Sequence, residues 1–236
     1  MVKSELVQRS PLRIFEKSIH GGLRPGSIGM LASRKGVGKT ACLVHLATDQ
    51  LLQNKHVIHV SFAGRTDHIV SWYEDIFKEI ARKRELDNAM DVHDELIRNR
   101  VIMNFSQDGI SMKQVLESLR AMVHQGNFDA DTLMVDGYDF EKGAPEDLDV
   151  IQDFADELGL ATWVTATLHR DDPSTDENGV PSKLVRYIDR ADILVTLTPT
   201  ERHVKLTLVK DHQDYPAEDL HLTLDPKTLL IAEEAT

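Results

Sequence analysis

The sequence predicts an α/β domain in which helices flank a central, mainly parallel sheet. Short apolar runs rich in β-branched residues alternate with longer stretches of helical periodicity, a pattern typical of parallel strands covered by helices. A glycine-rich loop joins the first apolar run to a helical stretch. Near the end of the chain, apolar and polar residues alternate, which predicts a C-terminal antiparallel hairpin at one edge of the sheet.

The individual elements follow from this alternation. Six strands are expected, at residues 28–32, 57–62, 100–105, 132–136, 161–166 and 193–197. Four helical stretches are expected, at residues 39–53, 67–98 (with a break), 111–125 and 145–158. The runs "HVKLTLVKDH" and "EDLHLTLDPKTLLIA" are expected to form the closing hairpin.

Composition limits the class of protein. The chain has 236 residues, of which 41% are hydrophobic and 28% charged, so we expect a single globular domain over residues 1–236. A net charge of −12 argues against a broad surface for nucleic-acid phosphates. The only cysteine, Cys42, excludes an intrachain disulfide and fits a reducing compartment. The sequence shows no apolar run of membrane-spanning length and no signal peptide, so a cytoplasmic protein is expected.

The glycine-rich loop has the pattern of a phosphate-binding loop. "SRKGVGKT" follows an apolar strand and opens a helix, although Ser33 stands where the common pattern begins with glycine. In such loops backbone N–H groups surround the phosphates, a lysine adds positive charge, and a Ser or Thr hydroxyl binds Mg²⁺. The residues predicted to bind nucleotide are Ser33, Arg34, Lys35, Gly36, Val37, Gly38, Lys39, Thr40 and Ala41.

A metal partner for this loop is expected at the end of another strand. The apolar run 133–135 leads directly into Asp136, and a carboxylate in that position binds Mg²⁺ in related phosphate-binding sites. Thr40 and Asp136 are therefore the predicted metal ligands, with Asp139 as a second candidate acid. Arg34 and Lys35 have two interpretations: solvated residues at the loop tip, or, for Arg34, an additional charge on the nucleotide.

With both halves of the site located, residues 21–62 resemble the core of the RecA-like P-loop NTPases. The similarity lies closest to the KaiC, RadA and DnaB-type ATPases, and Gly21-Gly22-Leu23 and Pro25-Gly26-Ser27 match the lead-in to their phosphate loop. It continues less strongly through "TATLHR" and "RADILVTL" to the closing hairpin, and covers roughly residues 11–231. The resemblance implies a RecA-like fold, ATP and Mg²⁺ as ligands, and a homo-oligomer with sites between subunits.

Three positions depart from the pattern of these relatives. Their catalytic glutamate follows the strand that here ends at Phe62, but this chain continues with Ala63 and Gly64. Thr167 stands where helicase-type relatives often have a glutamine that senses the γ-phosphate, and His212 replaces the arginine of a Lys-x-Arg pattern. Such an arginine raises the rate of phosphoryl transfer by a factor of about 10³–10⁵.

The resemblance leaves Lys39 and Lys210 as the candidate catalytic residues, Lys210 acting on a neighbouring subunit's nucleotide. We therefore expect an ATP-binding protein with weak or absent hydrolysis, which acts as a switch or assembly factor through protein partners. One alternative is an active DNA-dependent ATPase, but the loop that relatives use for DNA reads "HRDDPSTDENG" here and is acidic. A structural protein that has lost nucleotide binding is another. The third is a ParA or MinD-like ATPase, whose signature lysine would align with Arg34.

Overall fold

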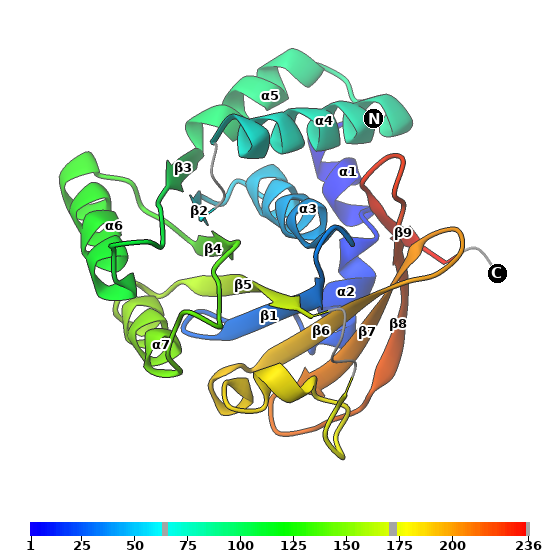
Figure 1. Cartoon of the computed structure of the whole chain (residues 1–236). Coiled ribbons are helices and arrows are strands. Elements are labelled where there is room, and N and C mark those ends of the chain that lie inside the picture. The colour runs from blue at the N-terminus through cyan, green and yellow to red at the C-terminus, as the bar shows by residue number, and fades with distance from the viewer. Residues whose placement is uncertain (63–65, 170–173, 235–236) are drawn as a thin grey trace.

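One mixed sheet of nine strands runs through the computed structural model, which describes residues 1–62, 66–169 and 174–234 (Figure 1). The strand order is β3-β2-β4-β5-β1-β6-β7-β8-β9. Strands β1 to β6 pair in parallel, and β6 to β9 pair antiparallel. The strands are β1 (Ile28–Arg34), β2 (Val57–Ser61), β3 (Arg100–Asn104), β4 (Thr132–Asp136), β5 (Ala161–Leu168), β6 (Ile193–Pro199), β7 (Val204–Asp211), β8 (Glu218–Leu224) and β9 (Ile231–Glu233).

Helices cover both faces of this sheet. One face carries α1 (Lys3–Gln8), α2 (Leu12–Ser18), α3 (Lys39–Leu52), α4 (Thr66–Arg84) and α5 (Ala89–Arg98). The other face carries α6 (Met112–Gly126), α7 (Glu146–Leu158) and the short 3₁₀ turns η1 (Ser182–Leu184) and η2 (Ile188–Arg190). None of the helices in the described residues is long and apolar enough to cross a lipid bilayer.

The predicted α/β class is confirmed, with a mostly parallel central sheet, flanking helices and an antiparallel C-terminal end. The C-terminal region forms three strands rather than a two-stranded hairpin. The side chain of Asp225 accepts hydrogen bonds from the backbone N–H groups of Lys227 and Thr228, and the resulting turn separates β8 from β9. Helices α1 and α2 were not predicted, because six and seven residues are too few to show a helical period clearly.

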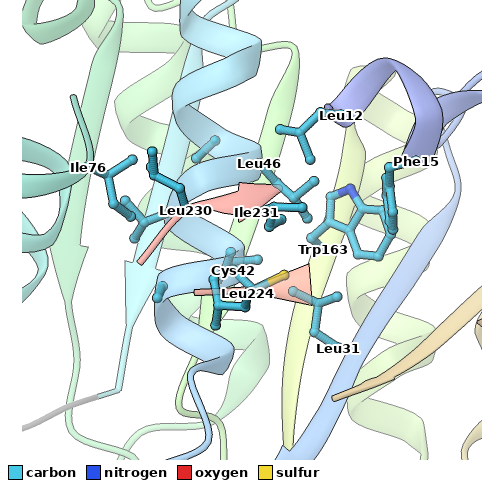
Figure 2. Close-up of a cluster of buried hydrophobic side chains, with 14 of the residues drawn as sticks. Leu12, Phe15, Leu31, Cys42, Leu46, Ile76, Trp163, Leu224, Leu230 and Ile231 are labelled. Carbon is cyan, nitrogen blue, oxygen red and sulfur yellow. The ribbon is translucent and has the colours of Figure 1, made fainter. Parts of the chain in front are cut away.

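The core beneath α3 positions the start of that helix. Cys42 and Leu46 are packed against Leu224 and Ile231 from the C-terminal strands (Figure 2). Leu12 and Phe15 of α2 complete this layer, and the rings of Phe15 and Trp163 lie 5.6 Å apart. Burial raises the pKa of the Cys42 thiol to about 12, so this cysteine is a packing residue rather than a nucleophile.

Close contact between β1 and β5 makes Gly29 intolerant of a side chain. A Cβ at Gly29 would lie 2.5 Å from Cζ3 of Trp163 on the neighbouring strand. We expect Gly29→Ala to lower the free energy of unfolding by about 1–3 kcal/mol, because the added methyl overpacks the core. Urea denaturation measures this loss.

The matched control is Gly126→Ala at the end of α6, where a Cβ would meet no atom within 4 Å. Alanine is the better helix former, so this variant is expected to be unchanged or slightly more stable. Equal stability of the two alanine variants would contradict the predicted clash at Gly29.

Candidate functional site

The glycine-rich loop joins the end of β1 to the start of α3. Gly36 and Gly38 have φ angles of 81° and 119°, a region that favours glycine. A Cβ at Gly38 would also lie 2.4 Å from Cδ2 of Leu224, so the turn needs glycine for space as well. Ser33, which replaces the first glycine of the common pattern, is an ordinary strand residue paired with Thr167, and its φ is not positive. The loop therefore tolerates serine at that position.

Five backbone N–H groups at this turn have no acceptor within the described part of the chain. They belong to Gly36, Gly38, Lys39, Thr40 and Ala41, and they precede or begin the first turn of α3; the N–H of Lys35, just after β1, has no acceptor there either. Unpaired N–H groups and the helix dipole make a helix N-terminus a favourable place for an anion. The next N–H, of Cys42, already donates to the Gly38 carbonyl at 2.9 Å.

Lys39 brings a buried positive charge to the same turn. Its ammonium donates to the carbonyl oxygens of Ser33 at 3.0 Å and Arg34 at 3.1 Å, and the residue is 8% exposed. Burial lowers the pKa of Lys39 to about 8, an effect that the nearby charge of Asp136 partly offsets. The side chains of Arg34 and Lys35 are exposed, so only Lys39 is held against the loop by hydrogen bonds.

Asp136, at the end of β4, faces this turn and is only 4% exposed. One carboxylate oxygen accepts a hydrogen bond of 2.9 Å from the hydroxyl of Thr40. The other accepts one of 2.8 Å from Thr165, whose own oxygen accepts from the Gly137 N–H at 2.9 Å. The structure thus joins the two predicted metal ligands, which are 96 positions apart in the sequence.

Thr165, which fixes the orientation of the carboxylate, was not predicted from the sequence. One signal in the sequence was available: Thr165 places a hydroxyl in the apolar centre of β5. It directly follows Val164, the residue that pairs with Val135 of β4. Asp139, the second candidate acid, makes a local contact instead: its side chain accepts the backbone N–H of Glu141 at 2.9 Å and closes a turn.

The oxygen atoms of Thr40 and Asp136 form a donor set that suits Mg²⁺, which prefers hard oxygen ligands and keeps several waters. Asp136 ends β4, and Thr40 follows the loop that leaves the carboxyl end of β1, so the pair lies at the edge where open α/β sheets place their ligands. A hollow of about 200 Å³ adjoins the loop over the ends of β1, β5 and β6. Arg34 and His169 line it, and His169 pairs with Glu141 at 2.7 Å.

Lys210 lies apart from this turn. It pairs with Leu194 of β6, which pairs with Met30 near the start of β1, whereas the glycine-rich loop leaves the opposite end of β1. The Lys210 ammonium donates to the Ile188 and Ala191 carbonyl oxygens, both at 2.7 Å, and the residue is 5% exposed. These bonds hold Lys210 within its own chain, so its action on a neighbouring subunit stays a prediction.

The three departures from the ATPase pattern lie in different environments. Ala63 and Gly64 lie outside the described residues, as do residues 170–173 of the acidic loop. Thr167 is exposed beside Ser33, at the edge of the turn. His212 is hydrogen-bonded to Asp211 at 2.8 Å, at the same end of the sheet as Lys210.

The geometry at the turn provides unpaired N–H donors, one buried ammonium and a carboxylate–hydroxyl pair. This combination can hold a polyphosphate together with a divalent cation. No protein-family model matches the chain, and a search of curated proteins returns no match either.

Proposed function

We propose that this chain is a RecA-like P-loop protein that binds ATP with Mg²⁺ and hydrolyses it slowly or not at all. The observation that carries the proposal is the convergence of Lys39, the unpaired N–H groups of the turn, and the Thr40–Asp136 pair. Each group has a partner in Mg²⁺-ATP: the N–H groups and the ammonium suit the phosphates, and the oxygen pair suits the metal.

Within the proposal, different residues would bind the phosphates and the metal. The N–H groups of Gly36, Gly38 and the first residues of α3 would surround the terminal phosphates. Lys39 would exchange its present carbonyl partners for phosphate oxygens, and Asp136 would orient Thr40 toward the metal. Bound Mg²⁺ would neutralise charge on the phosphate oxygens. Arg34, Lys35, Val37 and Ala41 complete the proposed nucleotide-binding loop.

Slow hydrolysis is inferred from the residues that would have to act on the γ-phosphate. Alanine and glycine at positions 63 and 64 carry no group that can accept a proton from water. Thr167 and His212 replace two polar groups of the hydrolysing relatives, and Lys210 is already bonded to two carbonyl oxygens. Within the proposal, bound ATP serves as a conformational signal to protein partners, in a homo-oligomer.

The proposal is tested by the binding of a labelled ATP analogue with Mg²⁺ and by steady-state turnover. We expect saturable binding and a turnover below about 1 s⁻¹, which is slow for an enzyme. DNA-stimulated turnover well above that value would instead identify an active motor, and the absence of binding would identify a structural protein. A crosslinked or co-purified partner that requires ATP would support the role as a switch.

The affinity for ATP should fall as the pH rises through about 8. Only protonated Lys39 can attract phosphate, and burial lowers its pKa to about 8, so the charged fraction in the free protein decreases above that value. Each further pH unit is expected to weaken binding by up to about tenfold. Dissociation constants measured from pH 6.5 to 9.5 give the slope.

Lys39→Arg is the control for this pH dependence, because a guanidinium stays charged over the whole range. Its absolute affinity differs from that of the parent, so only the slope is compared. A parallel fall in both proteins would contradict the assignment of the titration to Lys39.

A further inference from the structure

A second pocket, of about 420 Å³, lies along the carboxyl-terminal half of α3, whereas the phosphate loop precedes the amino-terminal end of the same helix. Its walls come from the α1–α2 segment, α3, the last turn of α4 and the C-terminal edge strand. Much of the apolar lining consists of buried side chains from all four walls: Leu6, Leu52, Ile80, Leu230 and Ile231. A cavity of this size and composition is typical of sites for small apolar ligands.

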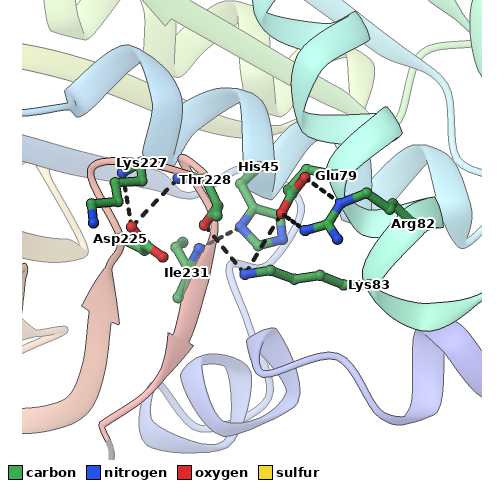
Figure 3. A network of polar contacts seen from close by, with 8 residues as sticks. All are labelled: His45, Glu79, Arg82, Lys83, Asp225, Lys227, Thr228 and Ile231. Atoms are coloured by element: carbon green, nitrogen blue, oxygen red, sulfur yellow. Dashed lines mark hydrogen bonds and ion pairs between the residues drawn. The ribbon is translucent and has the colours of Figure 1, made fainter.

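Two cations line the same pocket from the last turn of α4. The Lys83 ammonium lies 3.4 Å from the Thr228 hydroxyl and 3.9 Å from Glu79 (Figure 3). Glu79 is held more closely by Arg82, at 2.7 Å, so Lys83 keeps most of its capacity to bind an anion. Arg84 donates to the Arg9 carbonyl at 3.4 Å and has no carboxylate partner among the described residues.

The acids of the lining do not neutralise these cations directly. Asp49 is bound by Arg13 and by Gln53, the latter at 2.7 Å, and burial raises the pKa of its carboxyl. Glu233, on β9, makes no ion pair with any residue in the described part of the chain. The lining therefore carries two cations, Lys83 and Arg84, together with the carboxylate of Glu233, and Arg84 has no carboxylate partner among the described residues.

His45 adds a neutral polar group to the lining. Its Nδ1 accepts the backbone N–H of Ile231 at 2.8 Å, so the ring hydrogen is carried by Nε2 (Figure 3). Burial lowers the pKa of His45 to about 4, which keeps the ring uncharged at neutral pH. The pocket thus combines an apolar floor, a neutral imidazole and two cations with the carboxyl groups of Asp49 and Glu233.

We propose that this pocket binds a small carboxylic acid with an apolar tail, of the medium-chain fatty acid class. The tail lies over the buried leucine and isoleucine side chains, and the carboxylate binds Lys83 and Arg84. Arginine suits a carboxylate because its N–H groups match the two oxygens, and charge-assisted hydrogen bonds are stronger than neutral ones. This binding is independent of the proposed nucleotide site, since the two share no lining residue.

Calorimetric titration of the full chain with decanoate tests the proposal, with decanol as a neutral probe of equal length. We expect saturable 1:1 binding of decanoate and much weaker binding of decanol. The double variant Lys83→Ala with Arg84→Ala should weaken decanoate binding at least about tenfold, because it removes both charge-assisted partners. Lys78→Ala is the matched control, because Lys78 is an exposed cation of the same helix that does not line this pocket.

A second variant tests the position of the tail. Ala232 is half-buried and lines the pocket from β9, so Ala232→Trp should fill the cavity and abolish decanoate binding. Thermal melting establishes that each variant is folded. Three results would each overturn the proposal: no saturable binding of decanoate, equal binding of decanol, or unchanged affinity in the Lys83/Arg84 double variant.

Discussion

Replacing Lys39 with alanine is expected to lower the affinity for Mg²⁺-ATP by about 10- to 100-fold, the value of one or two charge-assisted hydrogen bonds. Lys39 is the only side-chain cation that hydrogen bonds hold at the turn within the described residues. Its removal leaves the backbone N–H groups in place, so residual binding is expected. Fluorescence anisotropy of a labelled ATP analogue measures the change.

The stability of the same variant separates binding from folding. Lys39 is buried with a lowered pKa, which means that its charge costs free energy in the folded protein at neutral pH. We therefore expect the melting temperature of Lys39→Ala to be equal to that of the parent protein or only slightly lower. Lys35→Ala is the matched control: this exposed loop lysine should be replaceable with little change in affinity. Unchanged affinity in Lys39→Ala would refute the nucleotide site.

Asp136→Asn is expected to remove the dependence of ATP binding on Mg²⁺. The amide keeps one oxygen for a hydrogen bond from Thr40 or Thr165 but loses the negative charge that a divalent cation requires. In the parent protein, chelating Mg²⁺ should weaken ATP binding by roughly tenfold or more, as expected when charge on the phosphates is left unneutralised. In the variant, binding with and without Mg²⁺ should be similar.

Asp139→Asn is the control for this second prediction. Its carboxylate closes a turn and lies outside the Thr40 pair, so Mg²⁺ dependence should persist. If Mg²⁺ strengthened ATP binding by Asp136→Asn as much as it does in the parent protein, the metal would bind elsewhere. That result would contradict the assignment of Thr40 and Asp136 as its ligands.

Much of the fold could be predicted from the sequence, because buried parallel strands are short, apolar and regularly spaced. The strand that ends at Asp136 and the helix that ends at Leu158 are examples, and both ends are confirmed at the predicted positions. The short helices α1 and α2 and the separation of β8 from β9 depend on tertiary packing and on one turn at Asp225. Such features leave little periodicity in the sequence.

The candidate site likewise has one part that the sequence predicts and another that depends on tertiary structure. The glycine-rich loop is contiguous, so its left-handed glycines and its lysine follow from a local pattern. Thr165 could not be singled out, because its importance depends on the register between β4 and β5, which the sequence does not specify. The pairing of Lys210 with two carbonyl oxygens also depends on how η2 folds back onto β7.

The most direct test of the proposed function is the chemical state of the bound nucleotide. The purified chain would be incubated with α-labelled ATP and Mg²⁺, separated from free nucleotide, and denatured for chromatography of the retained label. The proposal predicts near-stoichiometric label that is mainly intact ATP, with turnover below about 1 s⁻¹. Absence of retained label, or rapid conversion to ADP with multiple turnovers, would contradict it.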